Sequence, residues 1–464
     1  MELIAMPGDY DIAVIGGGAA GLAAARTARA RQARTLLISD GPVGGECTFT
    51  GCVPSKTLIE AARHGADFAT AMTEVRTAVQ TIAATESADV LRGEGIDVLT
   101  ARARFSSPGV LVADPGGRIV ARRFVIASGS RPAIPLIPGL AGSGYLTNET
   151  FFSLGGRPGR LAVLGGGAIG CELAQAAARL GAAVTLVEAA DRLLPPADPE
   201  ASEAARAALT RDGVRVLTGT TVSQVSRSGP AIVLRLSSGE LATADQLLVA
   251  TGRRPSTGGC GLEDAGVRLG ERGQVITSRT LRSTTAGIYA AGDVTGLMPF
   301  THAAYAMGRI AARNALRSHL TPPASFRTAA IPWVVFTDPE VAQAGLTEQQ
   351  AARQRTGAKV AYLPMAELDR AVAARRTDGF IKIITAGRPG LGLAGGGRVV
   401  GATVVAERAG EMISELGLAI RTGMFTGRLA QAAHPYPAWS LAIQQATAQF
   451  FGEFGGRTAR PARE

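Results

Sequence analysis

The sequence predicts an α/β protein with two strand–helix–strand domains, followed by a smaller α+β domain. The main observation is that an apolar strand, a glycine-rich turn and an alanine-rich helix occur together twice, in VIGGGAAG and again in VLGGGAIG. A second observation is the proline-containing stretch LTPPASF, beyond which strands and two amphipathic helical segments follow. Each strand–turn–helix unit is typical of a Rossmann-like dinucleotide-binding domain, so we expect two such domains in this chain.

The two turns supply glycines at matching positions: Gly16, Gly18 and Gly21 in the first, and Gly165, Gly167 and Gly170 in the second. The first glycine of each set makes the tight turn, the second lets the backbone approach a pyrophosphate, and the third lets the helix pack on the strand. The N-terminus of the helix then faces the phosphates. One such motif is a weak signal, whereas two in one chain are a much stronger one.

An acidic residue about twenty positions after the glycines is expected to bind the ribose of the dinucleotide. Counting 23 residues from Gly165 leads to Glu188, at the end of VTLVE, and we expect this carboxylate to hold a ribose diol. The same count from Gly16 leads to Ser39, with Asp40 one step later. The first motif therefore departs from the pattern, and the role of Asp40 in cofactor binding stays open.

Cys47 and Cys52 lie in GGECTFTGCVPSK, some thirty residues after the first glycine turn. A helical stretch begins just after Cys52, with Pro54 near its first turn, so the partial positive charge of the helix N-terminus would lower the pKa of the Cys52 thiol. A structural disulfide, half of a zinc site and two inert buried thiols are the alternatives. No second CxxC or His pair lies near enough to complete a zinc tetrad, and nothing else suggests secretion. We therefore predict a redox-active pair and no resident metal.

Length and composition describe a globular protein. The chain of 464 residues has room for two to four domains, and its composition is 46% hydrophobic and 19% charged. No apolar run approaches the ~18 residues that a membrane span requires. The N-terminus, MELIAMPGDY, has neither a basic start nor an adequate apolar stretch, so we expect no signal peptide and a reducing, cytoplasmic setting.

The formal net charge of +10 raises the question of a nucleic-acid partner. The basic residues are overwhelmingly Arg and are scattered, rather than gathered into blocks with interleaved aromatic residues. We therefore expect no nucleic-acid function and no membrane partner, although such a field can attract anionic dinucleotides.

These motifs together make the chain resemble the flavin-dependent pyridine nucleotide disulfide oxidoreductases, the group that contains dihydrolipoamide dehydrogenase, glutathione reductase and mercuric reductase. The resemblance covers nearly the whole chain. The matching segments, in order, are the first glycine motif, GGECTFTGCVPSK, FVIASGSRP, the second glycine motif, LLVATGRRP, GIYAAGDVTG, IPWVVFTDPEVAQAGLT and GEMISELGLAIRTGMF.

The resemblance implies an FAD-binding domain formed by residues 1–150 and 279–325, an NAD(P)-binding domain over 151–278, and a dimerisation domain over 326–464 that makes a homodimer. It also implies roles for single residues. Asp293, in AAGDV, would bind the ribitol of FAD, and Gly129 and Gly252 belong to two further cofactor-binding segments.

By the same resemblance, Lys56 pairs with Glu172 beside the flavin ring, Cys52 is the thiol nearest the flavin, and Cys47 attacks the substrate. A lysine beside the flavin could stabilise negative charge on the reduced ring, and a buried lysine without a carboxylate partner would be costly.

The C-terminal segment departs from the family pattern. Disulfide-reducing relatives have a His before a Pro and a Glu five residues after that His, and these supply acid and base. In AHPYPAWSLAIQQ, aligning Pro437 with the family proline puts Tyr436 in the His place and Leu441 in the Glu place. Tyr is a poor base at neutral pH. Mercuric reductases resemble this chain in having a Tyr there, but they carry a C-terminal cysteine pair, whereas no Cys follows Cys260 here.

Two interpretations of this segment stay open. Tyr436 or His434 takes part in catalysis, or His434 ends a helix and Tyr436 packs at the interface. Among the other notable residues, we expect Cys171 and His302 to be structural, Cys260 to lie in a loop, and His64 and His319 to have no role in the site.

The sequence thus predicts an FAD-dependent oxidoreductase that passes electrons from NADH or NADPH, with NADH favoured because of Glu188, through the Cys47/Cys52 pair to an acceptor. Loss of the His and Glu pair favours a metal ion or a quinone as that acceptor. The alternatives are dihydrolipoyl dehydrogenase or another disulfide reductase and, in a different class, a flavin-binding regulatory or scaffold protein with negligible turnover.

Overall fold

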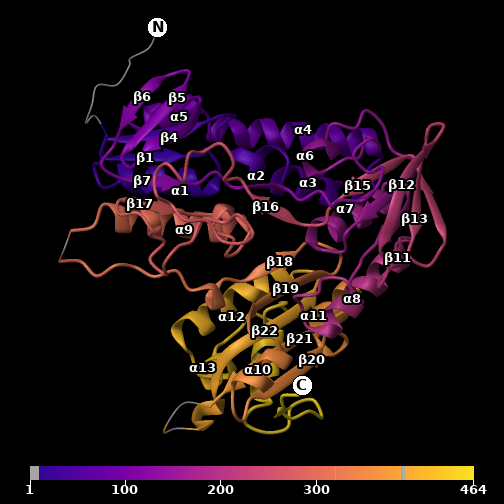
Figure 1. The fold of residues 1–464 in the computed structure, drawn as a ribbon. Helices are drawn as coiled ribbons and strands as arrows, with labels where there is room; N and C mark the ends of the chain where they lie inside the picture. The colour runs from indigo at the N-terminus through magenta and orange to yellow at the C-terminus, as the bar shows by residue number, and fades with distance from the viewer. Residues whose placement is uncertain (1–9, 319, 388–389, 391) are drawn as a thin grey trace.

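The computed structural model describes residues 10–318, 320–387, 390 and 392–464. The chain forms three regions, of which the first contains two separate stretches of sequence, and the C-terminal region lies against the second (Figure 1). His319 and most of the N-terminal MELIAMPGDY segment lie outside the described residues. The predicted fold class is confirmed, because two parallel sheets precede an antiparallel one.

The first region is built on a parallel sheet of five strands in the order β17-β7-β1-β2-β3. Its last strand in sequence, β17, follows the whole second region and pairs with β7. The strands are β1 (Ile12–Ile15), β2 (Thr35–Ser39), β3 (Asp97–Thr100), β7 (Phe124–Ile126) and β17 (Ile288–Ala290). A separate antiparallel sheet contains β4 (Arg102–Ser107), β5 (Val110–Asp114) and β6 (Gly117–Val120).

Helices α1 (Ala19–Arg29) and α9 (Thr301–Ala315) pack closely on each other in this region. Gly308 allows the approach, because a Cβ there would lie 2.1 Å from the carbonyl oxygen of Ala20. The contact places the N-terminus of α9 beside the segment after β2, where the chain forms a group of helices. These are α2 (Gly45–Phe49), α3 (Cys52–Arg63), α4 (Phe68–Thr85) and α5 (Ala88–Gly93).

The second region repeats the pattern on a parallel sheet in the order β11-β10-β9-β15. Its parallel strands and helices are β9 (Arg160–Leu164), α7 (Ala168–Arg179), β10 (Ala183–Val187), α8 (Pro199–Arg211), β11 (Arg215–Leu217) and β15 (Gln246–Val249). The antiparallel strands β12 (Val222–Ser228), β13 (Ala231–Leu236) and β14 (Leu241–Ala244) form a second sheet. The short helix α6 (Asn148–Phe151) precedes β9. Two short strands, β8 (Ser130–Pro132) and β16 (Arg253–Pro255), pair where the chain passes between the two regions.

The C-terminal region is an antiparallel sheet in the order β18-β19-β22-β21-β20-β23. Its strands are β18 (Trp333–Val335), β19 (Glu340–Gly345), β20 (Lys359–Pro364), β21 (Phe380–Ala386), β22 (Arg398–Ala406) and β23 (Arg460–Pro461). Its helices are α10 (Glu348–Gln354), α11 (Asp369–Ala374), α12 (Ala409–Thr422), α13 (Thr426–Gln431) and α14 (Leu441–Ala448), so the described part of this region has more helical segments than the two that the sequence predicts. The domain boundaries drawn from the sequence stay a prediction.

Candidate active site

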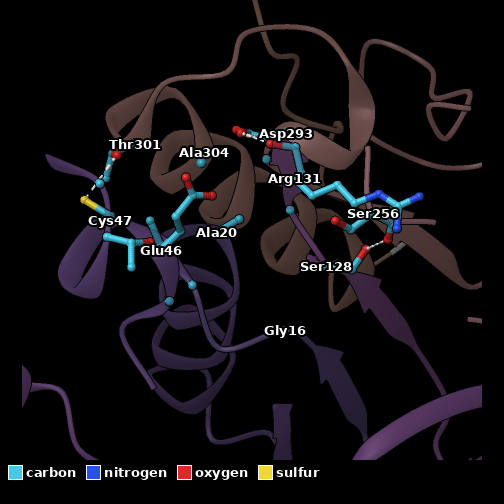
Figure 2. Close-up of a pocket in the computed structure, with 18 of the residues that line it drawn as sticks. Gly16, Ala20, Glu46, Cys47, Ser128, Arg131, Ser256, Asp293, Thr301 and Ala304 are labelled. Carbon is cyan, nitrogen blue, oxygen red and sulfur yellow. Dashed lines mark hydrogen bonds between the residues drawn. The ribbon is translucent and has the colours of Figure 1, made fainter. Parts of the chain in front are cut away.

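A cavity of about 1230 Å³ runs from the first glycine turn to the paired cysteines. All three regions line it, since Gly16 and Cys47 come from the first, Glu172 from the second and Phe336 from the third. Figure 2 shows Cys47, Thr301 and Glu46 at one side of this cavity and Asp293 and Arg131 at another. The cavity is large enough for a bulky dinucleotide cofactor.

The first glycine turn has the shape that such a cofactor requires. Gly16 has a φ of +112°, and a Cβ on it would lie 2.2 Å from the carbonyl oxygen of Ala127. Gly18 ends the turn as the N-cap of α1, and a Cβ there would meet nothing nearer than 4.0 Å. A Cβ on Gly21 would lie 1.8 Å from the carbonyl oxygen of Gly16. Only Gly18 therefore faces open space, which leaves room for a pyrophosphate at the helix N-terminus.

The second turn repeats this geometry. A Cβ on Gly165 would lie 2.5 Å from the carbonyl oxygen of Ala250, and one on Gly170 would lie 1.9 Å from that of Gly165. Gly167 has nothing within 4 Å of its Cβ position. The Glu188 carboxylate accepts backbone N–H bonds from Gly166 at 2.5 Å and from Ala190 at 2.7 Å. These two hydrogen bonds hold the Glu188 carboxylate beside the second glycine turn.

Cys47 and Cys52 are free thiols that share one hydroxyl group. Thr301, the first residue of α9, lies with its Oγ1 3.2 Å from Cys52 Sγ and donates to Cys47 Sγ at 3.3 Å. Figure 2 shows the contact with Cys47. Cys52 is itself the first residue of α3. Two helix N-termini therefore meet at the thiols, and each favours negative charge there.

The surroundings separate the two thiols in acidity. The hydrogen bond from Cys47, followed by the charge of Lys56 and the Thr301 hydroxyl, lowers the pKa of Cys52 to about 6, although burial opposes the shift. The hydrogen bond to Cys52 and burial raise the pKa of Cys47. The pKa of Cys52 is lowered as the sequence predicts, but its neighbouring thiol is the largest cause. The pair therefore holds one thiolate at neutral pH, on Cys52.

Lys56 lies one helical turn after Cys52 and forms an ion pair with Glu172, at 2.7 Å between Nζ and Oε2. The other oxygen of Glu172 accepts the backbone N–H of Phe336 at 2.9 Å. The Phe336 ring lies 4.7 Å from the Lys56 ammonium nitrogen, a cation–π contact. The Glu172 side chain is only 5% exposed, so this carboxylate needs its cationic partner.

Asp293 and the predicted glycines lie along the same cavity. Asp293 accepts a hydrogen bond from Ser130 Oγ at 2.6 Å, and Arg253 Nε lies 3.6 Å from its carboxylate. Gly129 and Gly252 have φ values of +72° and +124°, and a Cβ on either would meet nothing within 4 Å. Asp40 is exposed and lines the cavity just after β2.

The C-terminal residues are not in the cavity. Tyr436 is 72% exposed, and its hydroxyl donates to Asp369 at 2.9 Å, a contact that raises the pKa of Tyr436. His434 lies with Nε2 3.2 Å from Glu415 Oε2 and lies three residues after the end of α13. Leu441 begins α14. Within one chain, these side chains therefore stay apart from the thiols.

The remaining candidates have local contacts. Cys171 is fully buried, and burial raises the pKa of its thiol. Cys260 lies in the cavity wall, and burial raises its pKa as well. His302 lines the cavity, with Nε2 2.6 Å from the carbonyl oxygen of Pro332. His64 is an exposed side chain 3.6 Å from Glu60.

Sequence reasoning missed four residues of the site. Thr301 contacts Cys47, Phe336 contacts Lys56 and Arg253 lies beside Asp293, whereas Glu46 pairs with Arg253. Glu46 and Arg253 stand inside the quoted motifs, and Thr301 precedes His302. These residues were thus visible in the sequence, but their contacts join segments that lie up to 254 residues apart, which no local pattern reveals.

Over the described ranges, no group of three His, Cys, Asp or Glu side chains could hold a metal ion. No helix in those ranges combines the length and hydropathy of a membrane span.

Two family profiles match the chain. The pyridine nucleotide-disulphide oxidoreductase profile matches residues 10–308, and the dimerisation domain of the same family matches residues 331–447. Mercuric reductase from Bacillus cereus is 34% identical over 462 residues, covering 95% of this chain and 72% of the relative. Dihydrolipoyl dehydrogenase from Chlamydia pneumoniae is 31% identical over 460 residues, covering 94% and 95%.

Among solved structures, the Cu(II) complex of the HOCl-induced flavoprotein disulfide reductase RclA from Escherichia coli superposes with a TM-score of 0.87 at 28% identity, covering 96% of this chain and 99% of that one. The resemblance seen in the sequence is thereby confirmed. The chain belongs to the pyridine nucleotide-disulphide oxidoreductases and is an FAD-dependent NAD(P)H oxidoreductase of that family.

Proposed function

We propose that the protein is a reductase that takes electrons from NADH through the Cys47/Cys52 pair and delivers them to a metal ion or a quinone. The observation that carries the proposal is the difference in acidity between the thiols. The hydrogen bond from Cys47, the Lys56 ammonium group and the Thr301 hydroxyl stabilise a thiolate on Cys52, while Cys47 stays a neutral thiol. FAD, when bound, supplies a two-electron carrier between the nicotinamide and the disulfide. The protein would act as a cytoplasmic homodimer through its C-terminal domain.

The side chains have separate tasks in this scheme. Reduction opens the Cys47–Cys52 disulfide, which takes up two electrons and one proton to give a thiol on Cys47 and a thiolate on Cys52. Thr301 and Lys56 stabilise the Cys52 thiolate, and Glu172 holds Lys56 in place. Cys47 is then the thiol that meets the acceptor. For a metal ion the attacking atom is sulfur, and the reaction needs little proton handling.

The C-terminal segment supports an acceptor other than a disulfide. Asp369 raises the pKa of Tyr436, so even less of this side chain than of an ordinary tyrosine is present at neutral pH as the tyrosinate that could accept a proton. General acid–base catalysis typically contributes 10²- to 10⁴-fold, and a disulfide substrate would lose this contribution. The relatives named mercuric reductase act on a metal ion by that name, and the RclA structure is a Cu(II) complex.

The test is a comparison of four acceptors: mercuric ion, a benzoquinone, lipoamide and glutathione disulfide. We expect good turnover with the first or second and slow turnover with the last two. A Cys47→Ala variant should keep quinone reduction, which can take electrons directly from the flavin, and lose mercuric ion reduction, which needs both cysteines. Tyr436→His combined with Leu441→Glu should raise lipoamide turnover. Rapid lipoamide or glutathione reduction by the unmodified protein would refute the acceptor assignment and favour a dihydrolipoyl dehydrogenase or another disulfide reductase.

We also propose that NADH is preferred over NADPH. The Glu188 carboxylate can accept hydrogen bonds from a free ribose diol, and it would repel a 2′-phosphate. The one nearby cation in that loop, Arg192, donates to the carbonyl oxygen of Pro195 at 2.7 Å. A kcat/KM for NADPH equal to or above that for NADH would contradict this preference. Negligible turnover with every acceptor and both nucleotides would favour the regulatory or scaffold alternative.

A further inference from the structure

Glu46, the residue before Cys47, carries a side chain that leaves its own segment and binds the second region. Its carboxylate pairs with the guanidinium of Arg253 through both oxygens, at 2.6 Å for the Nη1–Oε1 contact. The same oxygen Oε1 accepts the side-chain N–H of Asn148 at 2.6 Å. Figure 2 shows Glu46 projecting into the cavity beside Cys47. One carboxylate thus joins the redox segment to α6 and β16.

Arg253 continues these contacts across the cavity wall. Its Nε donates to Ser130 Oγ at 2.7 Å, and Ser130 Oγ donates to Asp293 at 2.6 Å. Arg253 and Ser130 lie on the two paired strands that connect the first and second regions. The side chains of Arg253 and Glu46 are only 16% and 30% exposed, so each needs the other as a charge partner. The anchor for Glu46 is therefore the connection between the regions.

Besides the contacts of Glu46, the segment that carries Cys47 has one longer hydrogen bond on this side, from the side-chain N–H of Asn148 to the carbonyl oxygen of Thr50 at 3.3 Å. Helix α2 has only five residues, and it lies between Gly44, with a φ of +112°, and Gly51. A helix this short gains little stability from its own hydrogen bonds. Thr48 holds the opposite side, where its hydroxyl donates to Glu86 at 3.1 Å. The ion pair of Glu46 is thus the one charged contact of this segment with the second region among the described residues, and it lies directly beside Cys47.

We propose that Glu46 is a positioning residue that holds Cys47 within reach of Cys52 and thereby sets the reduction potential of their disulfide. The proposal rests on the redox role proposed above for the pair. Disulfide formation removes two electrons and one proton from the Cys47 thiol and the Cys52 thiolate, and a sulfur–sulfur bond forms. The electrons and the proton pass to the acceptor, which in the assay below is oxidised dithiothreitol. The equilibrium of disulfide formation depends on the effective concentration of one thiol at the other. A held segment raises that concentration, stabilises the disulfide and makes its potential more negative.

The experiment measures the disulfide equilibrium in the FAD-loaded protein. The protein is equilibrated in mixtures of reduced and oxidised dithiothreitol, free thiols are alkylated, and the modified fraction is counted by mass spectrometry. Glu46→Gln keeps the shape of the side chain and removes its charge. We expect the equilibrium constant for disulfide formation to fall on the order of tenfold, which corresponds to a potential about 30 mV more positive.

Two further variants make the result specific. Arg253→Met removes the other half of the ion pair and should shift the potential in the same direction, so it carries the test if Glu46→Gln does not fold. Arg254→Met changes the exposed neighbour on the same strand and should leave the potential unchanged. An unchanged potential in both Glu46→Gln and Arg253→Met overturns the inference. So does loss of FAD with an unchanged potential, because the ion pair would then serve only cofactor retention. If the unmodified pair forms no disulfide at all, the proposed function itself fails.

Discussion

Replacing Thr301 with Val should raise the pKa of the Cys52 thiol. Val has nearly the same shape, but it removes the hydroxyl that lies 3.2 Å from Cys52 Sγ and 3.3 Å from Cys47 Sγ. The Thr301 hydroxyl has one proton for its two sulfur contacts. A thiolate on Cys52 can only accept, so when Cys52 is ionised that proton is donated to Cys52 rather than to Cys47, together with the proton of the Cys47 thiol. A hydrogen bond to a charged group contributes roughly 1.5–3 kcal/mol. At 1.36 kcal/mol per pKa unit, its loss corresponds to a rise of about 1 to 2 units.

The shift changes the charge state at neutral pH. The pKa of Cys52 is about 6 in the native protein, so its thiolate is mostly present at pH 7 and is lost as the pH falls through 6. In Thr301→Val the same loss should occur between about pH 7 and 8. The assay is the long-wavelength thiolate-to-flavin absorbance of the two-electron-reduced protein, recorded against pH. Thr301→Ser keeps the hydroxyl and should titrate like the native protein. Titration of Thr301→Val within about 0.3 unit of the native protein would refute the reasoning, since that shift is well below the one worked out here.

Three other predictions concern single side chains. Cys52→Ala should abolish the thiolate-to-flavin absorbance, and persistence of the band would mean that the other thiol contacts the flavin. Lys382→Met should lower the free energy of unfolding by roughly 3–5 kcal/mol, because the Lys382 side chain is 1% exposed and its loss leaves the fully buried carboxylate of Asp198 without this cation. Glu200, the exposed partner of Lys382, provides the control, because Glu200→Gln should lower the free energy of unfolding by at most about 1 kcal/mol, measured by denaturant unfolding. Equal losses in the Lys382 and Glu200 variants would contradict the prediction. Burial raises the pKa of Glu340 to about 7 from 4.5, so the folded state binds the extra proton and loses stability as the pH rises between those values. Glu340→Gln should remove that part of the decline in melting temperature from pH 5 to 8, and an unchanged decline would show that Glu340 is not its source.

The sequence by itself determined the local units of this protein. The glycines at 16, 18 and 21 act within one strand–turn–helix unit, where each requirement is met by residues a few positions apart. The same is true of Cys52 at the start of α3. Such features depend on backbone geometry and on the helix N-terminus, so a short pattern is enough to predict them. Order along the chain then identified the family, because unrelated proteins rarely share so many units in one sequence.

Only the tertiary structure decided which distant side chains share the site. Thr301 reaches Cys47 because α9 packs on α1 through Gly308, and that packing depends on a glycine and on a returning strand far along the chain. Arg253 reaches Glu46 because β8 and β16 pair between the two regions. The lowered pKa of Cys52 likewise has its largest cause in the facing thiol, whose position depends on these contacts. Hydrogen bonds and ion pairs act over a few ångströms in space, and the sequence does not encode those distances until the packing of apolar faces has fixed them.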